Sequence, residues 1–181
     1  IFVDRSNNLW VGTQLGGINL YNPNRHKFEL ISHLINSNFS KCKEILSIAE
    51  TQNGQILFQN ALEGIALFDP TERKILRWIQ TGFTGNCIVP ENNKDYFLVG
   101  TPEGLYRFKL AENQFEFIST KNKVKNFEGD IKSIVPIGNN QYWMAGKDGM
   151  FLYDMDKGET LNYFGIGNSN LGSENIRSLR I

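Results

Sequence analysis

The sequence predicts an all-β fold: a β-propeller segment of about four four-stranded antiparallel blades plus the first strand of a fifth, from a larger propeller for which we expect seven blades. A recurring phrase and the spacing of its copies predict it. The phrase LWVGTQLGGINLYNP, Leu9 to Pro23, returns without a gap as ILFQNALEGIALFDP, 47 residues later. It returns again as FLVGTPEGLYRF, 40 residues further on, and as YWMAGKDGMFLY, after another 45.

A second phrase precedes the later copies of the first. It reads EILSIAE, NCIVPE and DIKSIVP before the second, third and fourth copies, and NIRSLRI at the end, where a fifth copy begins. A period of 40 to 47 residues is typical of a four-stranded antiparallel unit in a propeller or array. An ordinary β-sandwich is the alternative, but a sandwich has no reason to repeat a two-part phrase at this spacing.

Each copy predicts four strands. Strand one is the Ile-x-x-Ile segment, strand two the aromatic-aliphatic trio, strand three the stretch that follows the glycine, and strand four the segment after the next turn. Strand one is expected at 45–48, 131–135 and 176–179, strand two at 9–11, 56–58, 97–99 and 142–144, and strand four at 27–31, 75–79, 114–118 and 160–164. The expected blades are about 1–36, 40–80, 85–122 and 129–165, with a partial next blade at 176–181.

Strand two is apolar at consecutive positions, which predicts that both of its faces are buried, as between two neighbouring blades. A glycine ends each turn between strands two and three, at a hairpin position where a positive φ penalises other residues. Asn22, Asp69 and Asp154 then supply side-chain oxygens for the next turn. The four glycines are Gly17, Gly64, Gly104 and Gly149.

Length, charge and hydropathy exclude some classes of function. The 181 residues suit one domain, and Lys plus Arg equal Asp plus Glu at 19 each, so the formal net charge is zero. Without a basic stripe there is little to neutralise phosphates, so we expect no nucleic-acid partner. The longest apolar runs, of four or five residues, are too short for a membrane span. The strand-like opening IFVD shows no leader and suggests a piece of a longer protein.

Cysteine and acidic motifs predict no cofactor and no metal. Cys42 and Cys87 have no Cys-x-x-Cys or Cys/His neighbourhood; we expect buried or half-buried thiols, with one disulfide as the open alternative. The stretch DMDKGE, from Asp154 to Glu159, resembles the start of a calcium loop, but no bidentate glutamate follows at the right distance. Asp154 also occupies the repeated turn position, so we interpret it as turn chemistry.

An incomplete ring would expose the apolar faces of its two end blades. We therefore expect the remaining blades in the natural protein. The isolated segment should oligomerise, close into an unusually small ring, or be unstable.

The repeated phrase resembles the two-component regulator propeller repeat. The first copy carries the resemblance best, and the later copies drift; it rests on Asp4, Leu9 to Thr13, Gly17 and Tyr21 to Pro23. The resemblance covers nearly the whole chain. It implies the periplasmic sensor region of a bacterial hybrid two-component protein, in which paired seven-bladed propellers precede an immunoglobulin-like domain, a membrane helix and a histidine kinase. It also implies sensing of oligosaccharides from polysaccharide breakdown.

The predicted ligand site lies on the face formed by the strand two–three turns and the blade-to-blade connections. Polar residues that differ between blades are the better candidates, because structural roles repeat whereas an asymmetric ligand needs asymmetric contacts. We expect no catalytic residue and no metal ligand among them. The ligand-binding candidates are Gln14, Asn60, Glu63, Glu103, Lys147 and Asp148.

Two sets of apolar residues have a structural interpretation beside the functional one. One large apolar residue recurs in each blade-to-blade connection. We interpret it as filling the gap between blades, with a sugar platform as the alternative. Trp10 and Trp143 belong to strand two and should pack; Trp78 lies on strand four and either packs at the edge or contacts another domain. The recurring apolar residues are Phe39, Phe83, Phe127 and Leu171.

The leading hypothesis is a non-catalytic periplasmic sensor that binds a small molecule or oligosaccharide and signals to a histidine kinase outside this segment. Its partners would be the remaining blades and signalling domains of the parent protein, and the chain could form a homodimer. The alternatives are a polysaccharide lyase or hydrolase, which needs paired carboxylates or a metal on the ligand face, and a protein-interaction scaffold. Only Glu63, Glu103 and Asp148 could supply carboxylates there.

Overall fold

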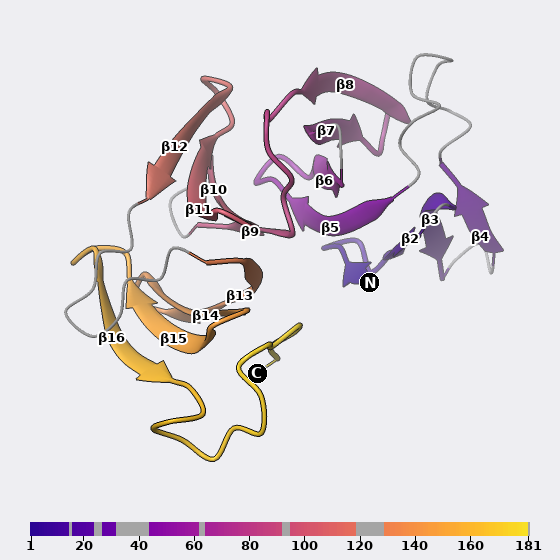
Figure 1. Ribbon diagram of the computed structural model, residues 1–181. Coiled ribbons are helices and arrows are strands. Elements are labelled where there is room, and N and C mark those ends of the chain that lie inside the picture. Colours follow the sequence, from indigo (N-terminus) through magenta and orange to yellow (C-terminus); the bar gives the residue numbers. More distant parts are fainter. Residues whose placement is uncertain are drawn as a thin grey trace. The chain divides into compact units, whose positions relative to one another are not determined.

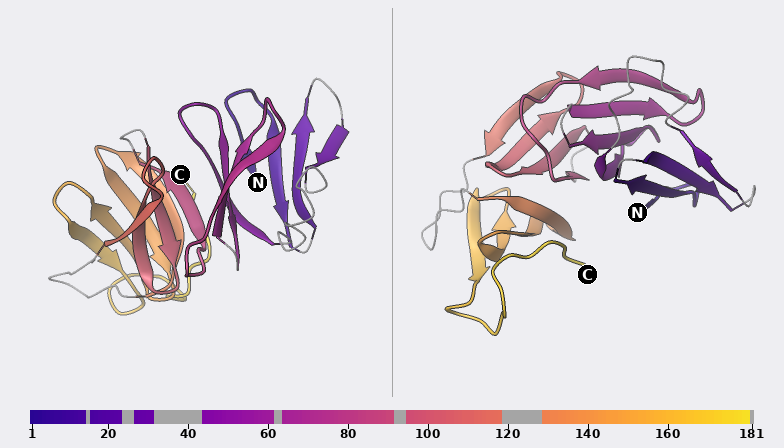
Figure 2. Two further views of the ribbon diagram at one scale, coloured as in Figure 1. Left: turned by 90° about the horizontal axis from the view of Figure 1, so that it is seen from above. Right: turned by 45° about the vertical axis from the view of Figure 1, so that its right-hand side comes forward.

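The computed structural model describes residues 1–14, 16–23, 27–31, 44–61, 64–91, 95–118 and 129–180. Within these residues every regular element is a β-strand, and all sixteen strands fall into four separate four-stranded sheets. In each sheet the strands pair with their neighbours in sequence, and every assigned pairing is antiparallel (Figures 1 and 2). The predicted all-β class and the predicted repeat of a four-stranded meander are therefore confirmed.

The chain divides into two compact units, Ile1–Ile88 and Val89–Ile181. The first unit contains sheets 1 and 2. Sheet 1 consists of β1 (Phe2–Val3), β2 (Leu9–Thr13), β3 (Gly17–Asn22) and β4 (Lys27–Leu30). Sheet 2 consists of β5 (Ile45–Glu50), β6 (Ile56–Asn60), β7 (Gly64–Asp69) and β8 (Lys74–Ile79).

The second unit contains sheet 4 and all but the first two residues of sheet 3. Sheet 3 consists of β9 (Cys87–Pro90), β10 (Tyr96–Thr101), β11 (Gly104–Lys109) and β12 (Gln114–Ile118). Sheet 4 consists of β13 (Ile131–Gly138), β14 (Gln141–Gly146), β15 (Gly149–Asp154) and β16 (Glu159–Phe164).

In sheets 2 and 3 the second strand is buried on both faces, as its unbroken apolar sequence predicts, whereas in β2 only Trp10 is buried. All five residues of β6 are buried, and so are the last five of β10. In the first unit this strand belongs to a core that includes Trp10, Phe58 and Phe68, with the Trp10 and Phe68 rings edge to face at 6.0 Å. Trp78 packs against the same core from the outer strand, in agreement with edge packing.

Within each unit, the second strand of one sheet lies against the first strand of the next. The contacting pairs are β2 with β5 and β10 with β13. A Cβ added to Gly12 in β2 would lie only 3.0 Å from the Cβ of Ile45 in β5, so these two backbones approach closely. In the second sheet the sizes are reversed: the buried side chain of Gln59 fills the space, and a Cβ at Gly85 would lie 2.5 Å from its Cδ. Sheet packing therefore pairs one small residue with one large residue.

A serine near the start of strand one also joins successive repeats. The Ser47 hydroxyl accepts a hydrogen bond from the Ile88 N–H at 3.0 Å, and Ser133 accepts one from the Leu179 N–H at the same distance. The Ile176 N–H donates to the carbonyl of Gly146 at 2.8 Å. The predicted fifth copy of strand one thus lies beside β13 and β14; the described residues 176–180 are not assigned to a sheet of their own.

The acidic turn residues have the role that the sequence predicts. One carboxylate oxygen of Asp69 accepts the N–H groups of Thr71 and Glu72, and one of Asp154 accepts those of Asp156 and Lys157. The turn after Asn22 lies outside the described residues. Asp154 is thus occupied by its own turn, in line with the turn interpretation of the DMDKGE stretch.

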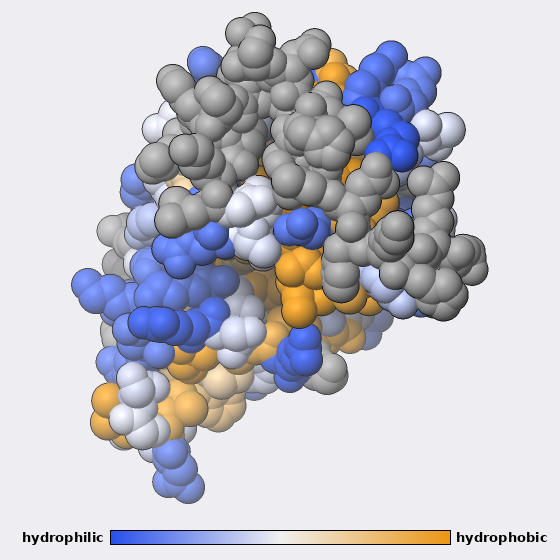
Figure 3. Space-filling view, turned by 90° about the vertical axis from the view of Figure 1, so that its right-hand side faces the viewer, coloured by the Kyte–Doolittle hydropathy of each residue, from blue (hydrophilic) through white to orange (hydrophobic). Residues whose placement is uncertain are grey.

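Apolar residues also reach the surface, as the space-filling view shows (Figure 3). The largest exposures in the first unit are at Ile1 and Val3, and in the second at Phe117 and Ile166. Over the described parts of the chain, no helix has the length and apolar character needed to cross a membrane. The side chain of Cys87 is buried, whereas Cys42, Phe39 and Phe127 lie outside the described residues.

Candidate functional site

The turns between the second and third strands define the candidate site. In each hairpin a glycine pairs with the last residue of the preceding strand, as in Asn60 with Gly64 and Thr101 with Gly104. Positive φ angles at these glycines were the central backbone prediction, and they are confirmed. They are 75° at Gly17, 114° at Gly64, 136° at Gly104 and 103° at Gly149.

Threonine hydroxyls close two of these turns. The Thr13 hydroxyl donates to the carbonyl of Gly17, and the Thr101 hydroxyl donates to that of Gly104, both at 3.0 Å. Thr101 also accepts the N–H of Glu103 at 3.1 Å. The threonine of the Gly-Thr phrase therefore fixes the turn that carries Glu103, a role that the sequence analysis did not assign.

In the first unit, one candidate is exposed and another is buried. Gln14 is exposed in its turn, whereas only 2% of Asn60 is accessible because this residue ends β6 and pairs with Gly64. The neighbouring Gln59 donates to the Asn60 carbonyl at 3.2 Å, and its side-chain oxygen has no hydrogen-bond partner among the described residues. Glu63 lies outside the described residues.

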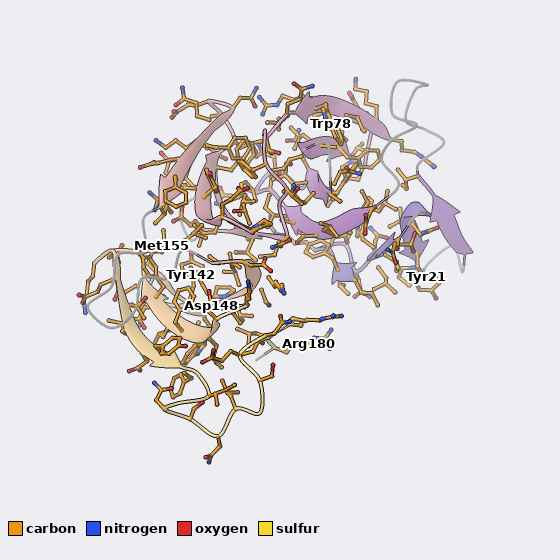
Figure 4. The ribbon with its side chains drawn as sticks, viewed as in Figure 1. Tyr21, Trp78, Tyr142, Asp148, Met155 and Arg180 are labelled. Carbon is orange, nitrogen blue, oxygen red and sulfur yellow. The ribbon has the colours of Figure 1, made fainter. Side chains whose placement is uncertain are left out.

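In the second unit, Glu103 and Lys147 are exposed and Asp148 is half-buried. Lys147 and Asp148 share one turn, and Glu103 occupies the equivalent turn of sheet 3, so three candidates lie at corresponding hairpin ends of two sheets. Figure 4 shows Asp148 beside β14 and β15. The Lys147 N–H donates to the carbonyl of Asp130 at 3.1 Å, which ties this turn to the segment before β13.

The segment after β16 is fastened to the same turn. The Tyr163 hydroxyl donates to the Asp148 carbonyl at 2.8 Å, and the Gly149 N–H donates to the Glu174 carbonyl at 2.8 Å. The Glu174 carboxylate accepts the Ile166 N–H at 3.1 Å. These long-range contacts position Asp148; the polar character of this connection was predicted, but its fastening by Tyr163 and Glu174 was not.

The acidic residue at the end of strand one is structural. Asp4 accepts hydrogen bonds from the N–H groups of Ser6 and Asn8, the Asn8 side chain and the buried Trp10 indole, at 2.8 to 3.0 Å. Burial alone would raise the pKa of Asp4, but these bonds favour the charged form and hold the pKa below its usual value. The carboxylate therefore fixes the turn between β1 and β2 and has little capacity left for a ligand.

Sheet 3 places Glu91 at the equivalent position. Its carboxylate receives two hydrogen bonds from the Arg107 guanidinium, at 2.9 and 2.8 Å, and the guanidinium also lies over the Tyr96 ring. The hydrogen bond to Glu91 raises the pKa of Arg107 further. Arg107 and Glu91 bind each other within the fold, so the Glu91 carboxylate, like that of Asp4, has a structural role. No group of three or more potential metal ligands occurs in the described part of the chain.

Comparison with solved structures identifies the fold. The chain matches the extracellular domain of "the putative hybrid two component system BT3049 from B. thetaiotaomicron" with a TM-score of 0.73 and 19% identity, over 97% of this chain and 23% of that one. It matches PorZ, a surface component of the type-IX secretion system of Porphyromonas gingivalis, with a TM-score of 0.75 and 17% identity, over 98% and 29%. It matches the β-propeller domain of Cps50 (Swd1) from Myceliophteria thermophila with a TM-score of 0.73 and 15% identity, over 100% and 57%.

The fold is a β-propeller fold. The prediction from the repeats is thus confirmed, and so is the structural likeness to the extracellular part of hybrid two-component systems. This chain spans about a quarter of the length of the two bacterial proteins. Comparison with protein-family models and with curated proteins finds no match.

Proposed function

We propose that the chain is part of a non-catalytic periplasmic sensor propeller of a hybrid two-component protein, which binds an oligosaccharide and signals to a histidine kinase. The observation that carries this proposal is the match of 97% of the chain to the extracellular domain of a hybrid two-component system. The resemblance of the first repeat to the two-component regulator propeller repeat supports the same assignment independently.

The ligand would bind at the strand two–three turns and the connections between sheets. Exposed amide, carboxylate and ammonium groups gather at these turns, and they suit hydroxyl groups because they supply both donors and acceptors. Glu103, Lys147 and Asp148 would contact the ligand in the second unit, and Gln14 and Glu63 would do so in the first. Asn60, which is buried at the end of β6, would contribute through the turn that it supports.

Signalling would follow from differential binding. A ligand that binds one arrangement of the sensor more tightly than another shifts a pre-existing equilibrium between them. The remaining blades, the signalling domains of the parent protein and a second copy of the chain would be the partners that transmit this shift.

A thermal-shift screen with neutral and acidic oligosaccharides, followed by calorimetric titration of each hit, tests the proposal. A ligand at 100 times its Kd stabilises the folded state by about 2.7 kcal/mol, so a true ligand gives a clear rise in melting temperature. We expect the double variant E103Q/K147M to weaken binding. The control E112Q/K157M changes the same residue types in exposed turns after β11 and β15 and should bind normally.

Two results would contradict the proposal. Failure of every oligosaccharide to raise the melting temperature would remove the sensing role. Cleavage of a bound oligosaccharide, detected by chromatography of the mixture, would favour the polysaccharide-active enzyme instead.

A further inference from the structure

The second residue of the Ile-x-Ser-Ile segment forms a β-bulge in both units. In sheet 2 the pairing of β5 with β6 shifts between Ile45 and Ser47, and in sheet 4 the pairing of β13 with β14 shifts between Ile131 and Ser133. The bulged residues are Leu46 and Lys132. A bulge leaves its residue out of the ladder and turns its side chain away from the regular alternation, and bulges are frequent beside functional sites.

In the two sheets that contain this bulge the bulged residue differs, although the residues around it do not. Isoleucine and serine flank it in both sheets, and the C-terminal copy has Arg177 at this position. Leu46 is 40% exposed and lines a hollow of about 220 Å³ in the first unit. A position with fixed geometry, a variable side chain and access to solvent is suited to contacts with an unsymmetrical ligand.

Lys132 is held in one place by two partners. Its ammonium donates to the side-chain oxygen of Asn175 at 2.8 Å and forms an ion pair with Asp130 at 3.1 Å, and 27% of the side chain is exposed. An ammonium has three N–H donors, so one remains available. Because the two contacts fix the position of the side chain, little conformational entropy is lost when the third donor binds a ligand.

Several groups near Lys132 have donors with unused hydrogen-bonding capacity. The amide nitrogen of Asn175 and the guanidinium of Arg177 have no hydrogen-bond partner among the described residues, and both residues are exposed. Lys147, whose N–H binds the Asp130 carbonyl, forms no ion pair in the part of the chain that the structure describes. The facing carboxylates are Asp130, which pairs with Lys132, Asp148, which lies against Gly129, and Glu174, which accepts the Ile166 N–H.

We propose that Lys132, Asn175 and Arg177 form a subsite for an acidic group, a carboxylate or a sulfate, on the ligand. Two cationic side chains and an amide supply the donors, and such charge-assisted hydrogen bonds are the stronger kind. The inference rests on the proposed function, and it narrows the ligand class to acidic oligosaccharides.

Calorimetric titration with three probes tests the subsite: a tetragalacturonate, the same tetrasaccharide with every carboxylate methyl-esterified, and a sulfated tetrasaccharide. We expect one of the two acidic probes to bind at least about tenfold more tightly than the ester, and its affinity to fall as salt is added. Which acidic probe binds identifies the recognised group as carboxylate or sulfate.

Variants locate the site. K132M should weaken binding of the acidic probe about tenfold, the usual loss for one hydrogen bond to a charged group, whereas K132R should retain most of it. R177Q alters only an exposed residue outside the sheets, so it tests the subsite even if K132M folds poorly. Lys157 is another exposed lysine, and the control variant K157M should bind the acidic probe like the unaltered protein.

The outcomes separate this inference from the proposed function. If neither acidic probe binds more tightly than the methyl ester, or if K132M and R177Q both leave binding unchanged, the acidic subsite is overturned and oligosaccharide sensing stays in place. Failure of neutral and acidic oligosaccharides alike would overturn both.

Discussion

The contact between the large side chain of Gln59 and the small residue Gly85 allows a quantitative test of how successive repeats pack. In the first repeat a glycine, Gly12, faces a large residue, Ile45; in the second, Gln59 is large and faces Gly85. We would change the second pair to alanine, first singly and then together. Alanine at Gly85 is conformationally acceptable, because Gly85 is not among the residues with a positive φ.

The structure gives the expected magnitudes. A Cβ at Gly85 would lie 2.5 to 2.6 Å from three atoms of the Gln59 amide, which is completely buried and cannot move into solvent. Overpacking of this kind costs about 2 kcal/mol. Q59A alone should cost about 1 kcal/mol, because the cavity is partly offset by removal of an amide oxygen that lacks a partner among the described residues.

In the double variant the added methyl group enters the space that Gln59 has vacated. The loss should therefore be smaller than the sum of the two single losses by about 2 kcal/mol. Urea denaturation followed by circular dichroism measures all four proteins. Losses that add within about 0.5 kcal/mol would refute the contact between strand two of one repeat and the start of the next.

Three further predictions concern the turns. G64A should destabilise the protein by about 3 kcal/mol, since φ at Gly64 is 114° and the new Cβ would overlap the Ile79 carbonyl. The control G54A should cost about 1 kcal/mol, because φ at Gly54 is 76° and no atom lies near the new Cβ. Equal losses of stability in thermal denaturation would contradict the hairpin assignment. D4A should cost about 3 kcal/mol because the buried Trp10 N–H loses its acceptor. Since the pKa of Asp4 is lowered in the folded protein, its stabilisation is present above its ordinary value of 3.8 and disappears as the pH falls through the lowered value. The stability of D4N should therefore depend less on pH between about 5 and 2; a slope equal to that of the unaltered protein would contradict this cause.

The repeated features could be predicted from the sequence because they are encoded locally. A glycine at one place in every copy predicts a positive φ, and an aspartate at one place predicts a turn; Gly104 and Asp154 confirm these rules. The boundaries of strand four are also accurate, as in Gln114–Ile118. Each inference needs only a few neighbouring residues and the turn geometry that they favour.

The candidate site was less predictable because it depends on contacts between distant residues. The sequence predicts that Asn60 is a turn residue. In the structure it is the last residue of β6, where it pairs with Gly64 across a turn of three residues, and it is buried. The bulge at Lys132 and its partner Asn175, 43 residues away, depend on strand pairing and on packing of the next segment. Tyr163 shows the same limit, because nothing near it in sequence indicates that its hydroxyl binds Asp148.

Amide hydrogen exchange with and without a binding oligosaccharide is the most direct test of the sensing face. The account predicts slower exchange at the turns 102–103 and 147–148 and around Lys132 and Asn175, since ligand contacts would protect those backbone groups. Protection confined to the outer strands β8, β12 and β16, with none at the turns, would contradict it.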